Sequence, residues 1–348
     1  MTIENNEFLL DLEKEEYRDN YIDCNNEFWQ AAARKNLVTK LNQNLSDAKS
    51  YGEDRKVNKS TSLSHNSILV SAERGAGKTV FLRNSEHIWE HDGGKNRGEL
   101  RFLKVVDPTM LINEDNFSNV IVAQIYREVE GHISENKTDS HNKTAFYNSL
   151  KTLADSLGKK DDFNGYSGID KILRYNSGIQ IEQLFHKYVE SAINILNCKA
   201  LVLPIDDVDM ALKRAFEVID DVRRLLGCPY IIPIVSGDIK LYTQMTNVYF
   251  DDHAYNKFSS EKLQNEGKVI AEEITESYLT KVFPNQMRLP LLPIHRITPR
   301  LKIQEKNSIS KSVSEYNQLI FKNFYLLCNN ENARKNWPEL RLLVNLRN

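Results

Sequence analysis

The chain has 348 residues, and its 46 basic and 48 acidic side chains leave a net charge of −2, which argues against a surface coated for duplex DNA. A hydrophobic content of 41% and a charged content of 27% exclude a mainly disordered, collagenous or fibrous chain. The longest apolar runs are far shorter than the roughly 18 residues of a membrane-spanning helix. Residues 1–8 lack the basic and apolar regions of a signal peptide, so we expect a cytoplasmic protein.

The first 63 residues are polar and predict an N-terminal helical arm and linker. Apolar residues recur at helical spacing between Phe28 and Leu45, which predicts one amphipathic helix there. Residues 46–64 are polar, and we expect them to form a nearly structureless connector.

Residues 64–293 alternate between short apolar runs and helical patterns. Strands are predicted at 67–71, 100–106, 200–205, 230–235 and 287–292, and helices at 79–90, 117–130, 179–196, 211–226 and 269–283. This order predicts an α/β fold with a mainly parallel sheet and helices on both faces. Residues 134–176 lack a clear period apart from a helical stretch at 145–157, and we expect an insertion rich in mobile loops.

A glycine-rich segment follows the first predicted strand directly and leads into a helix. It reads Ala72-Glu73-Arg74-Gly75-Ala76-Gly77-Lys78-Thr79, and Val80 comes next. The pattern is that of a phosphate-binding loop, G-x-x-x-x-G-K-[ST], with Ala72 in place of the first glycine. An accidental glycine-rich turn is the alternative, which the strand–loop–helix context disfavours.

The residue types in this loop suit a nucleotide. Gly75 and Gly77 allow a backbone whose N–H groups point inward and cradle phosphates. Lys78 would contact the β- and γ-phosphates, and the Thr79 hydroxyl would bind Mg²⁺. We therefore expect ATP and Mg²⁺ to bind at residues 73–80.

The strand predicted at 200–205 ends in Asp206-Asp207-Val208-Asp209, and an apolar strand followed by acids is the Walker B pattern. Asp206 would hold Mg²⁺, and Asp207 would orient the attacking water. Asp207 has a shorter side chain than the commoner Glu, so hydrolysis would be slow; Asp209 is its rival for the role. Acids that merely begin a helix are the alternative reading.

Ser236 directly follows the strand predicted at 230–235. A polar residue there can lie between the phosphate loop and the Walker B acids and sense the γ-phosphate, although an ordinary turn would also place a serine at this position.

Taken together, these motifs resemble the AAA+ superfamily and its STAND and origin-recognition-like relatives over residues 64–348. The resemblance implies that Ser236 is sensor 1 and that residues 294–348 form a small helical lid. Its last helix would carry a sensor 2 arginine, Arg341, for which a surface position is the alternative. The resemblance also implies a ring or other homo-oligomer, and a lid that is cut short at residue 348 as part of a longer protein.

In such oligomers a basic residue completes the neighbouring subunit's site. The candidates here, none preferred, are Lys281, Arg288, Arg223 and Arg224.

The segments Val106–Thr109 and Tyr278–Pro284 are similar to those of large bacterial ATPases of phage-defence systems, including RADAR-type systems. That similarity implies a defence role and a partner effector such as a deaminase.

The sequence therefore predicts an ATP-hydrolysing module that works as an oligomer. A nucleotide-controlled switch with little turnover is an alternative, motivated by Ala72 and Asp207. A DNA-remodelling ATPase is another, against which the near-neutral charge counts.

Overall fold

The computed structural model describes residues 8–11, 30–58, 62–112, 116–158, 169–211, 214–254, 260–304 and 309–325. The chain divides into two compact units, one formed by Gln30–Leu292 and the other by Met1–Trp29 with Pro293–Asn348. Each unit is described by itself.

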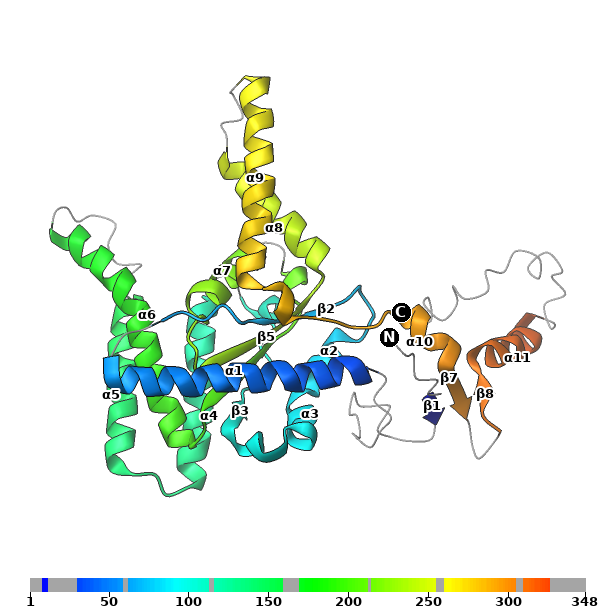
Figure 1. The fold of residues 1–348 in the computed structure, drawn as a ribbon, viewed down its shortest axis with the longest axis horizontal. Coiled ribbons are helices and arrows are strands. Elements are labelled where there is room, and N and C mark those ends of the chain that lie inside the picture. The colour runs from blue at the N-terminus through cyan, green and yellow to red at the C-terminus, as the bar shows by residue number, and fades with distance from the viewer. Residues whose placement is uncertain are drawn as a thin grey trace. The chain divides into compact units, whose positions relative to one another are not determined.

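A five-stranded parallel sheet forms the centre of the larger unit (Figure 1). Its strands are β2 (Ile68–Ser71), β3 (Leu100–Phe102), β4 (Ala200–Ile205), β5 (Ile231–Gly237) and β6 (Arg288–Pro290). Their order across the sheet is β3-β4-β5-β2-β6. The predicted α/β fold with a parallel sheet is confirmed, and β5 lies between β2 and β4.

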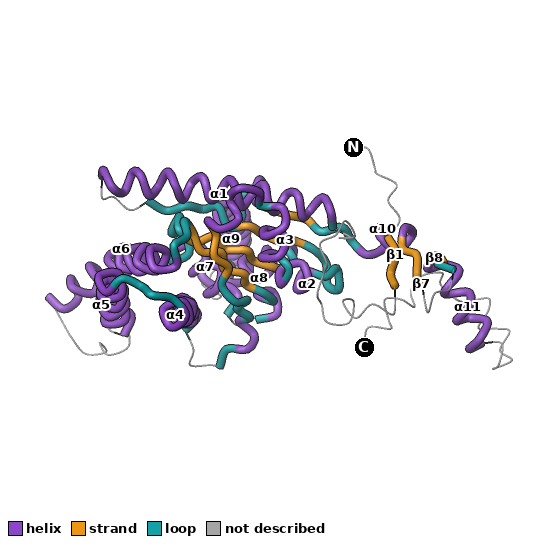
Figure 2. The backbone as a smooth tube through the Cα atoms, turned by 90° about the horizontal axis from the view of Figure 1, so that it is seen from below, coloured by secondary structure: helices purple, strands orange, loops and turns teal. Residues whose placement is uncertain are grey.

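Helices surround this sheet, and Figure 2 shows α1 along one side of it and α4 on the other. The helices of this unit are α1 (Ala31–Asn58), α2 (Lys78–Arg83), α3 (Ser85–Asp92), α4 (Phe117–Glu135), α5 (Ser140–Gly158), α6 (Ile169–Leu196), α7 (Ala215–Arg224), α8 (Ile239–Ala254) and α9 (Glu261–Val282). Every residue of β4 and β5 is buried, as the central strands of a covered parallel sheet require.

Helix α1 is much longer than the sequence pattern predicts. Residues 46–58, expected to be a nearly structureless connector, continue the helix, and α1 belongs to the same compact unit as the sheet. The buried face formed by Leu37, Leu41 and Leu45 continues through Ala48 and Tyr51 at spacings of three residues. The polar residues between them form the outer face of the helix rather than a linker.

A buried polar cluster joins α1 to α6. The Tyr51 hydroxyl lies 2.8 Å from His186 Nδ1, and Arg55 donates a hydrogen bond to the same hydroxyl at 3.0 Å. Arg55 also pairs with Glu190 on α6 at 3.0 Å. Because Arg55 donates to the Tyr51 oxygen, the tyrosine hydroxyl can donate its own proton to His186 Nδ1 when that nitrogen carries none.

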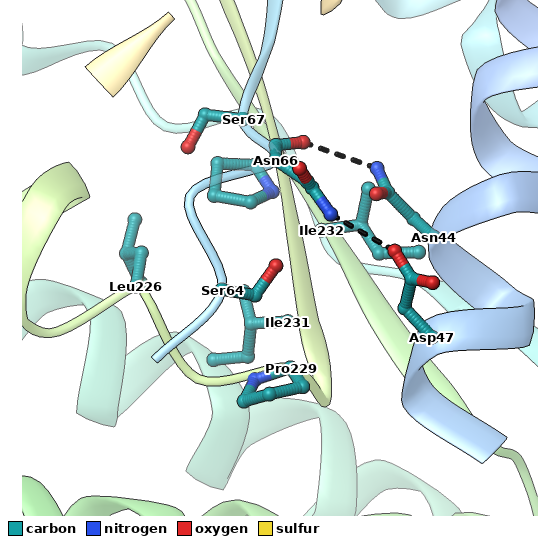
Figure 3. Close-up of a pocket in the computed structure, with 10 residues that line it drawn as sticks. Asn44, Asp47, Ser64, Asn66, Ser67, Leu226, Pro229, Ile231 and Ile232 are labelled. Atoms are coloured by element: carbon teal, nitrogen blue, oxygen red, sulfur yellow. Dashed lines mark hydrogen bonds between the residues drawn. The ribbon is translucent and has the colours of Figure 1, made fainter. Parts of the chain in front are cut away.

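A small cavity lies where α1 meets the segment that precedes β2 (Figure 3). Asn66 donates to Asp47 Oδ2 at 2.9 Å, and Asn44 donates to the Asn66 carbonyl at 3.1 Å. The cavity has a volume of about 10 Å³, which is room for about one water molecule. It is a packing feature of α1 and not a ligand site.

The insertion expected at residues 134–176 is mainly helical where the structure describes it. It contains the end of α4, all of α5 and the start of α6. The Phe146 ring stacks on Tyr188 at 5.2 Å and on Tyr126 at 6.4 Å, so α5 packs against both of its neighbouring helices. Most of the polar side chains of α5 are exposed or half-buried, and Ser149 is an exception that is buried.

Helices α8 and α9 form a hairpin that projects from the body of this unit (Figure 1). The sequence pattern missed α8 and predicted only residues 269–283 of α9. Small residues on the inner face of α9, namely Gly267, Ala271 and Thr275, are buried and let the two helices approach closely.

The described part of the smaller unit contains strands as well as helices, whereas the sequence predicts an N-terminal helical arm and a small helical lid over residues 294–348. Strand β1 (Phe8–Asp11) pairs in parallel with β7 (Leu301–Gln304), and β7 pairs antiparallel with β8 (Lys311–Ser312). Helices α10 (Ile294–Ile297) and α11 (Val313–Tyr325) complete the described part. Because this sheet joins the two ends of the chain, no local sequence pattern reveals it.

Within the described residues, no helix combines the length and the apolar character needed to cross a membrane.

His186 makes the stability of the larger unit depend on pH. Burial lowers the pKa of His186 to about 4, from 6.5. Between these values the unfolded chain binds more protons than the folded one, so stability falls as the pH falls. We expect a loss of about 2 kcal/mol from this histidine between pH 7.5 and pH 5.

The measurement is the free energy of unfolding in urea at both pH values. His186→Phe, which removes the titrating group, should flatten this part of the pH dependence, whereas His141→Gln on the exposed side of α5 should not. An unchanged pH dependence in His186→Phe would contradict the assignment.

Candidate active site

The phosphate-binding loop connects β2 to α2 with the backbone that the sequence predicts. Gly75 has φ 78° and Gly77 has φ 87°, both in the left-handed region that glycine adopts without strain. Gly77 is the N-cap of α2. Among the described residues, the non-glycine positions with positive φ are Asn197 and Asp207, so Ala72 needs no glycine-like backbone at the first position of the motif.

Lys78 is buried at the start of α2. Its Nζ donates to the Ala72 carbonyl at 2.9 Å and lies 3.9 Å from Asp209 Oδ2. Thr79 and Val80 follow in the first helical turn and are half-buried, whereas Glu73 and Arg74 are exposed. The loop thus leaves its outer residues open to a ligand and keeps its lysine inside.

Asp206 and Ser236 lie in direct contact at the carboxyl ends of β4 and β5. The Ser236 hydroxyl donates to Asp206 Oδ1 at 2.5 Å, and the Asp207 N–H donates to the same oxygen at 3.0 Å. Both side chains are buried. Ser236 therefore lies where the sequence predicts it, on the strand between the phosphate loop and the acids, and fixes the orientation of Asp206.

Asp207 has an unfavourable environment in two respects. Its backbone is left-handed, with φ 49° and ψ 30°, which costs free energy for a residue other than glycine. Partial burial raises the pKa of its carboxyl, and the negative charges of Asp206, Asp107 and Asp209 raise it further. Strain and like-charge repulsion at one position are typical of a functional site.

Asp209 and Asp107 complete the acidic cluster. Asp209, which the sequence offered only as a rival to Asp207, is buried and accepts a hydrogen bond from the Asp238 N–H at 3.0 Å. Asp107 follows β3, and its Oδ1 accepts from the Thr109 N–H at 2.9 Å. Asp107 was not among the predicted site residues, although an acid at the end of a predicted parallel strand is a usable signal.

The site suits nucleotide and Mg²⁺. The described residues hold no group of three or more His, Cys, Asp or Glu side chains arranged to bind a metal ion by themselves. Mg²⁺ does not require one, because it keeps several waters and uses one or two protein oxygens together with substrate phosphates. Thr79 and Asp206 could supply those oxygens, and the positive-φ glycine loop could supply N–H groups to the phosphates.

The remaining predicted residues are the sensor 2 arginine and the four basic residues that could complete a neighbouring subunit's site. Arg341 lies outside the described residues. Arg223 pairs with Asp220 at 2.8 Å, and Arg288 donates to the Phe283 carbonyl at 3.0 Å, so both bind within the chain. Arg224 also approaches Asp220, at 3.5 Å, and Lys281 is exposed.

Comparison with curated protein sequences found no similar one. The KAP family P-loop domain matches residues 54–292, about two thirds of the chain, and its match ends at the residue where the larger compact unit ends. The matched segment contains all five strands of the parallel sheet, the phosphate loop and the acidic cluster. The chain therefore belongs to the KAP family of P-loop domain proteins.

Proposed function

We propose that the chain binds ATP with Mg²⁺, hydrolyses it, and does so as a homo-oligomer. Membership of the KAP family makes nucleotide binding the expected activity, since P-loop domains bind nucleotides. The observation that carries the proposal is the meeting of three motifs. Lys78 on the glycine loop lies 3.9 Å from Asp209, and Asp206 of the same acidic segment is held by Ser236.

Each residue would have a defined task. The loop N–H groups and Lys78 would hold and neutralise the phosphates, while Thr79 and Asp206 would hold Mg²⁺, which would supply further positive charge to the phosphates. Asp207 orients the water that attacks the γ-phosphate. The raised pKa of its carboxyl makes it a better proton acceptor than an ordinary aspartate.

A nucleotide-controlled switch with little turnover is the second candidate. Ala72 at the first position of the loop and the short side chain of Asp207 favour slow chemistry. A DNA-remodelling role has the weakest support, because the net charge is only −2. Turnover measured with and without duplex DNA separates the three.

A role in bacterial phage defence with a partner effector such as a deaminase, in the cytoplasm, is part of the proposal. It rests on the resemblance of Val106–Thr109 and Tyr278–Pro284 to segments of defence ATPases. Infection of cells that carry Lys78→Ala in place of the wild-type residue would test it.

Lys78→Ala is expected to weaken binding of ATP by about 100-fold or more, because the buried ammonium is the main positive charge that the loop offers the phosphates. Equilibrium binding of a fluorescent ATP analogue with Mg²⁺ measures this. The matched control is Lys187→Ala, which removes an exposed lysine of α6 and should bind as the wild type does. No binding by the wild type at millimolar nucleotide would refute the proposed function.

Asp207→Asn is expected to keep ATP binding, to lose most turnover, and to raise the thermal midpoint of unfolding. Asparagine tolerates the left-handed backbone better than most residues and removes the repulsion with the neighbouring acids. Phosphate release and differential scanning fluorimetry measure the two effects. Turnover equal to that of the wild type would show that Asp207 does not orient the water. Asp209 would then be the first acid to test for that role.

Particle mass measured by light scattering with and without AMP-PNP tests the proposed oligomer. We expect a larger particle with the analogue and Mg²⁺. Lys78→Ala, which should not bind the analogue, serves as the control and should keep one mass. A single wild-type mass equal to one chain under both conditions would show that the oligomer is wrong.

A further inference from the structure

Asp209 has no part in the mechanism above, yet it joins the phosphate loop to another element. It lies on a short 3-10 helix, Val208–Met210, and is 3% exposed. Its Oδ2 atom has two neighbours: the Lys78 ammonium at 3.9 Å and the Asp238 N–H at 3.0 Å. One buried carboxylate oxygen thus faces the loop lysine on one side and the end of β5 on the other.

Asp238 is the point where β5 becomes α8. Its Oδ1 accepts from the Lys240 N–H at 2.9 Å, and its carbonyl accepts from the Tyr242 N–H at 3.0 Å. A movement of the Asp238 backbone therefore moves the first turn of α8.

At the base of the α8–α9 hairpin, close packing leaves little room for the end of β5 to move independently of the two helices. Tyr242 is fully buried, donates to the Ser236 carbonyl at 2.5 Å, and stacks on Phe283, where α9 ends, at 5.7 Å. A β-carbon at Gly237 would lie 2.3 Å from the Tyr242 hydroxyl, so the strand and the tyrosine are in closest contact. Because packed interiors transmit displacement, a shift at the tip of β5 passes to both helices.

We propose that Asp209 is a positioning residue that couples phosphate binding at Lys78 to the α8–α9 hairpin. The inference rests on the proposed function, in that the loop must bind a nucleotide. A phosphate competes with Asp209 for the Lys78 ammonium. If Lys78 turns to the phosphate, the buried Asp209 carboxylate loses its cationic neighbour, which costs free energy. Residues 206–209, or the hydrogen bond from the Asp238 N–H to Asp209, must then adjust. The hairpin, which projects from the body of the unit, would enlarge that adjustment (Figure 1).

Hydrogen–deuterium exchange of the full chain with and without AMP-PNP and Mg²⁺ tests the coupling. In the wild type we expect AMP-PNP to change exchange in residues 239–254. Asp209→Asn keeps an oxygen that can accept from the Asp238 N–H and removes the charge opposite Lys78. We expect it to bind AMP-PNP at least as tightly as the wild type, yet to lose more than half of the exchange response of α8.

Asp238→Ala is the matched control. It removes the side-chain cap on Lys240 but keeps the N–H that Asp209 accepts. Exchange in the first turn of α8 should therefore be faster without nucleotide, while the change caused by AMP-PNP is retained. Where Asp209→Asn does not fold, Asp209→Ser, which also keeps an acceptor oxygen, takes its place.

Binding is measured on the same samples, so that two failures can be told apart. Absence of AMP-PNP binding by the wild type would overturn the proposed function and the coupling with it. Binding without any response of α8, or a full response in the Asp209 variant, would overturn the coupling alone. A purely structural role for Asp209 would change stability and basal exchange without reducing the response to AMP-PNP.

Discussion

The site depends on one constraint, the position of β5 between β2 and β4 in a parallel sheet. The carboxyl ends of parallel strands meet at one edge, so the end of β2 presents Lys78, the end of β4 presents Asp206, and the end of β5 places Ser236 between them. The 2.5 Å hydrogen bond from Ser236 to Asp206 exists because these two strands are neighbours. An order in which β5 did not neighbour β4 would separate Ser236 from Asp206, and one in which β5 did not neighbour β2 would move Ser236 away from the phosphate loop.

The same constraint gathers negative charge, which the fold tolerates only with specific partners. Asp206 and Asp209 are buried, and each accepts hydrogen bonds from the backbone or from Ser236. Asp207 has no such compensation, and its carboxyl shows the raised pKa that results. The least satisfied of these three acids is thus also the least buried one.

Local sequence patterns were sufficient to predict the parts of this site that are formed by consecutive residues. The glycine loop and the acids after β4 could be predicted because each motif lies within ten residues and has its own residue types. The extent of α1 could not, since Tyr51 is recognised as a buried residue only once His186 of α6 and Tyr230, which precedes β5, lie against it. The pairing of β1 with β7 joins residues almost 300 positions apart, and the contact of Asp209 with a backbone N–H has no signature in residue types.

The charge balance of the site also limits how it can work. Four carboxylates, those of Asp107, Asp206, Asp207 and Asp209, lie near one another, and in the described part of the chain a single ion pair reaches them, from Lys78. Triphosphate would add several negative charges to this edge of the sheet. Coulomb repulsion in a partly buried site is strong, so the loop N–H groups and Lys78 alone are poor compensation. Under the proposed function, Mg²⁺ would therefore contribute to nucleotide binding as well as to chemistry, and a phosphate that approaches Lys78 would change its ion pair with Asp209.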